Sequence, residues 1–195
     1  MTSISPLTNF LKEGLFGDYK DKNESNLIKI QEEKNLLIAQ IVQYKNSSLQ
    51  IRDIIIDGLS MSHDPLKVIS NNDTRILWNG PKNWLLISKK KNLNENIKKT
   101  FVESDFAVTD LSHSRAIIGL EGENLKEVLK KGCPYNFNEM KKNMCVNSVF
   151  NGITITIDMI EENPEKIRLL ALRSFGESLA ESVTDACLEY GYKSI

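Results

Sequence analysis

Three residues close together in the sequence, Asp110, Ser112 and His113, are of the types that form a nucleophilic catalytic site. In such a site a serine hydroxyl attacks the substrate, a histidine accepts the proton, and a carboxylate orients the histidine. Side chains this close along an extended segment point to alternate faces, so the three groups are not expected to converge. The spacing therefore favours packing or turn hydrogen bonds over catalysis.

The three cysteines, Cys133, Cys145 and Cys187, have neither the spacing of a disulfide framework nor that of a zinc site. We expect them to be reduced thiols of a cytoplasmic protein. Cys133 follows the C-terminal end of a predicted helix, where the helix dipole raises the pKa of a thiol, so it is expected to be inert. The sequence predicts no catalytic, cofactor-binding or metal-ligating residue.

The charge balance excludes two classes of partner. The chain has 25 Lys and Arg residues against 26 Asp and Glu residues, a formal net charge of −1, whereas nucleic acids and anionic membranes require a basic excess. No segment has the continuous apolar run of a signal peptide or a membrane span. With 41% hydrophobic residues, the composition is that of a globular protein.

The first part of the chain predicts an N-terminal arm at residues 1–26, followed by one domain at 27–195. Strands are expected at 35–44, 74–78, 84–88 and 106–110, and helices at 51–59 and 93–101. Trp78 and Trp84 flank the turn of the expected hairpin at 74–88. An exposed recognition platform is one interpretation of this pair, but core or interface packing is favoured.

The second part of the chain also combines strands with two helices. Strands are expected at 114–120, 143–149, 153–157 and 167–172. Short helices are expected at 125–129 and from a capping box at 174–177. The last helix is expected to bury Phe175, Leu179, Val183, Cys187 and Tyr190. In the first part of the chain, the order strand, helix, strand, strand, helix, strand is typical of a ferredoxin-like, split βαβ α+β fold.

Residues 108–133 resemble a pattern of the aminomethyltransferase (T-protein) superfamily: Asp-hydrophobic-Ser-His, a strand, and a glycine-containing turn into a helix that ends in Leu. Three further segments, 77–86, 131–134 and 173–179, are similar to the gamma subunit family of heterotetrameric sarcosine oxidase. The segments are LWNGPKNWLL, KGCP and RSFGESL. Asn79 stands where the family usually has Leu, and 136–138 lack its usual Asp-Leu.

The resemblance implies a T-protein-like (folate-binding-domain-like) α+β fold. Its two split βαβ halves, about 27–110 and 111–195, would each pack an antiparallel sheet against helices. The residues that it marks as interface or structural positions are Trp78, Trp84, Asp110, His113, Arg115, Cys133 and Pro134.

The same resemblance implies a non-catalytic gamma subunit that stabilises the alpha subunit and also assembles with beta and delta subunits. Such a complex demethylates sarcosine oxidatively and passes the one-carbon unit to tetrahydrofolate. The FAD, FMN, NAD, tetrahydrofolate and zinc of the complex would lie on the other subunits. The alternative is a stand-alone folate-dependent one-carbon transfer protein, or an iron–sulfur or tRNA-maintenance protein, of the same superfamily.

Overall fold

The computed structural model describes residues 5–8 and 10–195, which form two compact units. Unit 1 combines the chain up to Lys34 with Ser114–Lys142 and Val146–Ile195, and unit 2 combines Asn35–His113 with Asn143–Cys145. This division differs from the predicted arm at 1–26 and the predicted halves at 27–110 and 111–195. The difference arises because strands from the N-terminal segment complete the sheet of the second half.

Unit 1 contains a seven-stranded sheet with the order β1-β14-β2-β10-β13-β12-β11. Its strands are β1 (Gly14–Phe16), β14 (Tyr192–Ser194), β2 (Ile28–Glu32), β10 (Arg115–Gly122), β13 (Glu165–Leu172), β12 (Ile153–Glu162) and β11 (Cys145–Phe150). The N-terminal strand β2 lies between β14, to which it is parallel, and β10, to which it is antiparallel. The predicted split βαβ order is thus interrupted by a strand from the opposite end of the sequence.

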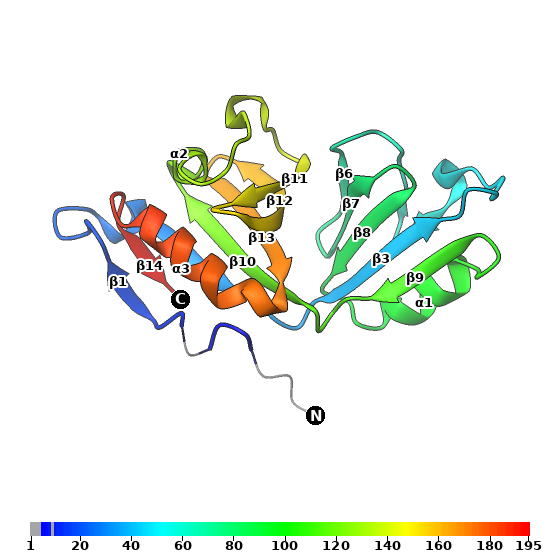
Figure 1. Cartoon of the computed structure of the whole chain (residues 1–195), viewed down its shortest axis with the longest axis horizontal. Helices are drawn as coiled ribbons and strands as arrows, with labels where there is room; N and C mark the ends of the chain where they lie inside the picture. Colours follow the sequence, from blue (N-terminus) through cyan, green and yellow to red (C-terminus); the bar gives the residue numbers. More distant parts are fainter. Residues whose placement is uncertain (1–4, 9) are drawn as a thin grey trace. The chain divides into compact units, whose positions relative to one another are not determined.

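Two helices, α2 (Leu125–Lys130) and α3 (Gly176–Cys187), contact β10 and β13 on one face of this sheet (Figure 1). Leu179, Val183 and Cys187 are buried as predicted, but Phe175 is 49% exposed. The predicted capping box is wrong, because Ser174 lies inside a 3-10 turn, η4 (Arg173–Phe175), that runs directly into α3. That turn directs Phe175 away from the core.

A row of charged side chains crosses the seven-stranded sheet, from Glu33 just after β2 to Asp158 on β12. Gly119 on β10 pairs with Arg168 on β13, which pairs with Asp158 on β12. The Arg168 guanidinium donates to the Glu33 carboxylate from Nη2 at 2.6 Å and lies 3.5 Å from Asp158 Oδ2. A side chain at Gly119 would bring its Cβ within 3.0 Å of Glu33 Oε1, so glycine leaves the space that Glu33 needs to reach Arg168.

Unit 2 contains a five-stranded antiparallel sheet with the order β6-β7-β8-β3-β9. Its elements are β6 (Val68–Ser70), β7 (Thr74–Gly80), β8 (Asn83–Ser88), β3 (Leu37–Gln43), β9 (Phe106–Asp110) and the helix α1 (Leu93–Thr100). The four strands predicted for this half are confirmed, and β7-β8-β3-β9 has the order of a split βαβ motif. Leu93 and Ile97 of α1 pack on the core side chains of this sheet, among them Ile41 and Leu86.

The prediction of a helix at 51–59 is wrong. The segment forms a 3-10 turn, η2 (Ile51–Asp53), and a two-stranded hairpin of β4 (Ile55–Ile56) and β5 (Leu59–Ser60). Asp57 and Gly58 occupy the turn with φ of 52° and 76°, the positive values that a tight two-residue hairpin turn requires. The Asp-Gly pair thus outweighs the helical spacing of the isoleucines.

Asp57 also anchors this hairpin to the five-stranded sheet of unit 2. Its carboxylate accepts hydrogen bonds from Lys90 Nζ at 2.8 Å, from Thr74 Oγ1 at 2.7 Å and from Asn71 Nδ2 at 3.2 Å. The hydrogen bond from Lys90, followed by that from Thr74, lowers the pKa of Asp57 below its ordinary value. Thr74 in turn shares a hydrogen bond with Ser88 at 2.8 Å.

Replacing Asp57 by Asn should lower the free energy of unfolding by about 1.5–3 kcal/mol at pH 7, the range for hydrogen bonds to charged groups. Because the pKa of Asp57 is lowered in the folded state, its contribution is fully present above the ordinary pKa. It is lost as the pH falls through the folded value, so wild type and variant should converge in acid. Urea unfolding between pH 7 and pH 3 measures this, with exposed Asp53→Asn as the control; a difference that does not shrink as the pH falls would contradict it.

Candidate functional site

The structure ties Asp110 and Ser112 into a turn. Ser112 Oγ accepts a hydrogen bond from the Ile38 N–H at 3.0 Å, and the Asp110 carboxylate accepts the Ser112 N–H at 2.9 Å. Hydrogen bonds from the Ser112 hydroxyl and then from its backbone lower the pKa of Asp110. His113 is exposed. The serine is therefore bonded to the aspartate and the backbone, an arrangement that does not activate it as a nucleophile.

Arg115 begins β10 and is half-buried. Burial lowers the pKa of its guanidinium, which donates to the Ser114 carbonyl at 3.4 Å. The guanidinium thus contacts the chain's own backbone at the start of the strand.

The segment from Lys131 to Pro134 connects α2 to two neighbouring elements. Lys131 Nζ donates to the Ala186 carbonyl at 2.7 Å, at the C-terminal end of α3, and lies 5.0 Å from the centre of the Tyr190 ring. Cys133 is buried and its thiol donates to Ser148 Oγ of β11 at 3.2 Å, whereas Pro134 is exposed. These contacts give the motif a structural role.

The other two cysteines are also buried. Cys145 Sγ donates to the Trp78 carbonyl at 3.2 Å. Burial raises the pKa of Cys187 to about 12, which keeps this thiol protonated and unreactive at neutral pH.

Trp78 and Trp84 are cross-strand partners on β7 and β8. Trp84 is only 1% exposed, and its indole N–H donates to the Ser62 carbonyl at 2.7 Å. Trp78 is half-buried. Trp84 is therefore a core residue of unit 2, and the interpretation of this tryptophan as part of an exposed recognition platform is wrong.

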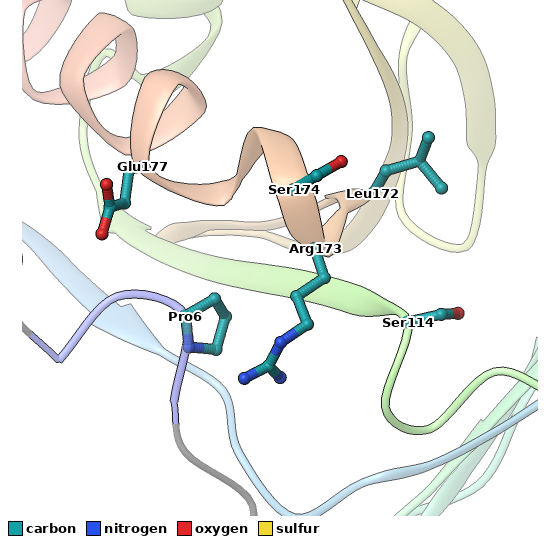
Figure 2. Close-up of a pocket in the computed structure, with 6 residues that line it drawn as sticks. All are labelled: Pro6, Ser114, Leu172, Arg173, Ser174 and Glu177. Atoms are coloured by element: carbon teal, nitrogen blue, oxygen red, sulfur yellow. The ribbon is translucent and has the colours of Figure 1, made fainter.

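An open hollow of about 570 Å³ lies in unit 1 where β13 passes into α3. Figure 2 shows the Arg173 side chain extending toward Pro6, with Ser114 at the start of β10 and Glu177 on the first turn of α3. The backbone N–H of Arg173 donates to the Ser114 carbonyl at 2.9 Å, which holds the two strand ends together. The remaining lining residues are Leu172 and Ser174.

The hollow combines polar groups with apolar surface. Arg173 supplies donors, Glu177 supplies acceptors, and Leu172 at its rim is 47% exposed. Such a surface is suited to contact with another polypeptide. The motif at 173–179 does not by itself predict a site, because the exposure of these residues depends on the turn η4, which the sequence pattern does not indicate.

Within residues 5–8 and 10–195, no three His, Cys, Asp or Glu side chains are grouped in a way that could hold a metal ion. Within the same residues, no helix is long and apolar enough to span a bilayer.

Known proteins share this fold. A chain of heterotetrameric sarcosine oxidase from Corynebacterium sp. U-96 superimposes with a TM-score of 0.80, covering 96% of this chain and 95% of the other at 20% identity. Aminomethyltransferase T of the glycine cleavage system from Bartonella henselae superimposes with a TM-score of 0.64, covering 88% of this chain and 48% of the other at 10% identity. The chain therefore has a T-protein-like α+β fold, built mostly of strands.

The sequence comparisons are more specific. The model of the sarcosine oxidase gamma subunit family matches residues 56–189. Sarcosine oxidase subunit gamma from Corynebacterium sp. (strain U-96) is 28% identical over 120 residues, a match that spans 60% of this chain and 58% of the relative. The chain belongs to the sarcosine oxidase gamma subunit family.

Proposed function

We propose that this chain is the non-catalytic gamma subunit of a multisubunit sarcosine oxidase and stabilises the alpha subunit of that complex. The family match over residues 56–189 carries the proposal. The fold likeness to a chain of a heterotetrameric sarcosine oxidase over nearly the whole sequence supports it.

The chemistry of the described side chains agrees with a structural role. The hydroxyl of Ser112 is bonded to Asp110, and the thiols of Cys133 and Cys187 are buried. In this proposal, the oxidative demethylation of sarcosine, and the FAD, FMN, NAD, tetrahydrofolate and zinc that it uses, belong to the alpha, beta and delta subunits. The alpha subunit is the most direct partner in this proposal.

Co-expression tests the assembly. A tagged copy of this chain should be recovered with alpha and beta subunits, and the chain purified alone should show no flavin absorbance. Monomeric behaviour with no association at micromolar alpha subunit would contradict the proposal. Calorimetry of the isolated chain with tetrahydrofolate provides a second test, because tight binding would favour a stand-alone folate-dependent protein.

Replacing His113 by Asn should leave the turnover of the assembled complex within about twofold of wild type. His113 is exposed, and the hydrogen bonds of the neighbouring Asp110 come from Ser112. A twofold change corresponds to about 0.4 kcal/mol, well below the effect of removing a general base. Steady-state turnover of complexes with equal subunit content measures it. A large loss of turnover in a normally assembled complex would show that His113 takes part in the chemistry.

A further inference from the structure

Strand β9 forms one edge of the five-stranded sheet of unit 2. Its five residues pair with β3 in continuous register, from Phe106 opposite Gln43 to Asp110 opposite Ala39. In the part of the chain that the structure describes, no strand pairs with the outer side of β9. The strand is therefore regular and long enough to pair with another strand.

The hydrogen bonds at the two ends of β9 establish which backbone groups point outward. Leu111 N–H donates to the Ile38 carbonyl at 2.8 Å, and Tyr44 N–H donates to the Asp105 carbonyl at 2.8 Å. Because antiparallel bonds alternate along a strand, Ala107 and Thr109 also bond to β3. The N–H and C=O groups of Val108 and Asp110 then point away from the sheet.

Sheet edges in proteins are normally protected by Lys, by Pro, by a bulge or by a covering segment. The sequence of β9, FAVTD, contains no Lys or Pro, and its register with β3 has no bulge. The opposite edge strand, β6, differs, because the segment 143–145 covers it. Val68 N–H of β6 donates to the Asn143 carbonyl at 2.8 Å, and Lys67 forms a bridge with Met144.

We infer that β9 accepts an extended segment of the alpha subunit as a sixth strand of this sheet. The inference rests on the proposed function. Backbone hydrogen bonds to Val108 and Asp110 would supply the affinity, as in other cases of strand addition. Phe106 to Thr109 carry no charge and Asp110 is exposed and acidic, so the segment that fits is uncharged along its middle with a basic residue beside Asp110.

Residue-resolved hydrogen–deuterium exchange tests the pairing directly. In the isolated chain the amides of Val108 and Asp110 should exchange much faster than those of Ala107 and Thr109, which bond to β3. Adding the alpha subunit should slow Val108 and Asp110 at least tenfold and leave the inner pair nearly unchanged. Slow exchange of Val108 that depends on the concentration of the isolated chain would overturn the inference, because the strand would then pair with a second copy.

A matched pair of variants tests the contribution to affinity. Val108→Pro removes an outward N–H, a substitution that edge strands tolerate. Val108→Thr keeps the N–H and changes the half-buried side chain, which packs against the core of unit 2. We expect Val108→Pro to weaken association with the alpha subunit at least tenfold and Val108→Thr to weaken it less than twofold. Circular dichroism and thermal unfolding would show that both variants are folded.

The outcomes distinguish the two proposals. If both variants bind alpha as wild type does and the outer amides stay unprotected, the strand addition is wrong and the proposed function stands. If wild type itself fails to bind alpha, the proposed function is wrong and the strand addition is wrong with it.

Discussion

Replacing Gly191 by Ala is expected to lower the free energy of unfolding by about 3 kcal/mol or more, the sum of a left-handed backbone penalty and a steric clash. Gly191 has a φ of +71°, and a Cβ there would lie 2.5 Å from the Asp18 carbonyl oxygen. Gly17, with a φ of +73°, makes the reciprocal close approach to the Leu188 backbone. Asp18 N–H donates to the Leu188 carbonyl at 2.8 Å between these contacts. Backbone atoms on both sides leave no flexible group to move aside.

Gly152→Ala is the matched control for this prediction. Gly152 also lies in unit 1 and has a φ of +82°, but nothing lies within 4 Å of the position of its Cβ. Its loss should therefore be limited to about 1–2 kcal/mol, the left-handed backbone penalty alone. Urea unfolding of the two variants separates the terms. Equal losses of unfolding free energy in the two variants would contradict the prediction. They would show that the backbone around Asp18 can move away from a side chain at position 191.

Replacing Arg168 by Met is expected to cost about 3–5 kcal/mol, the range for removing one member of a buried ion pair. The Asp158 side chain is fully buried and the Glu33 side chain is 16% exposed, so the variant would leave two negative charges beside each other in a poorly solvated place. The expected result is a clear fall in the urea midpoint at pH 7.

The neutralised variant provides the control. Combining Arg168→Met with Glu33→Gln and Asp158→Asn removes the repulsion, so it should recover at least about 1 kcal/mol of the loss. Single Glu33→Gln and Asp158→Asn variants complete the comparison. A single Arg168→Met variant as stable as wild type would show that the carboxylates are solvated, contrary to their burial.

Local patterns in the sequence predicted most of the individual elements. The alternation of Ile and Thr at 153–157 predicts β12, and the apolar spacing at 93–101 predicts α1, because side-chain periodicity follows directly from backbone geometry. The prediction of a helix at 51–59 was wrong, because the preference of Asp57 and Gly58 for a tight turn outweighed the helical spacing of the isoleucines. The same principle explains Ser174, whose sequence context resembles a cap but whose backbone forms a 3-10 turn.

Features that depend on distant contacts were not accessible from one sequence. The position of β2 between β14 and β10, and the pairing of β1 with β14, join segments from opposite ends of the chain. The row through Glu33, Gly119 and Arg168 depends on that position. The hollow at Arg173 requires both η4 and the approach of Pro6, so the motif at 173–179 alone does not predict its lining residues.

The position of β2 has a consequence for synthesis. Ile28 pairs with Tyr192, a separation of 164 residues, so β2 emerges from the ribosome long before its parallel neighbour exists. At about 5–20 residues per second, the delay is roughly 8 to 33 s. Throughout that time the edge of β2 that faces β14 stays open, even after β10 has been made, and is a potential site of aggregation. Its alternation of Ile28 and Ile30 with Lys29 and Gln31 leaves one face charged or polar, which limits the association of nascent chains through this strand.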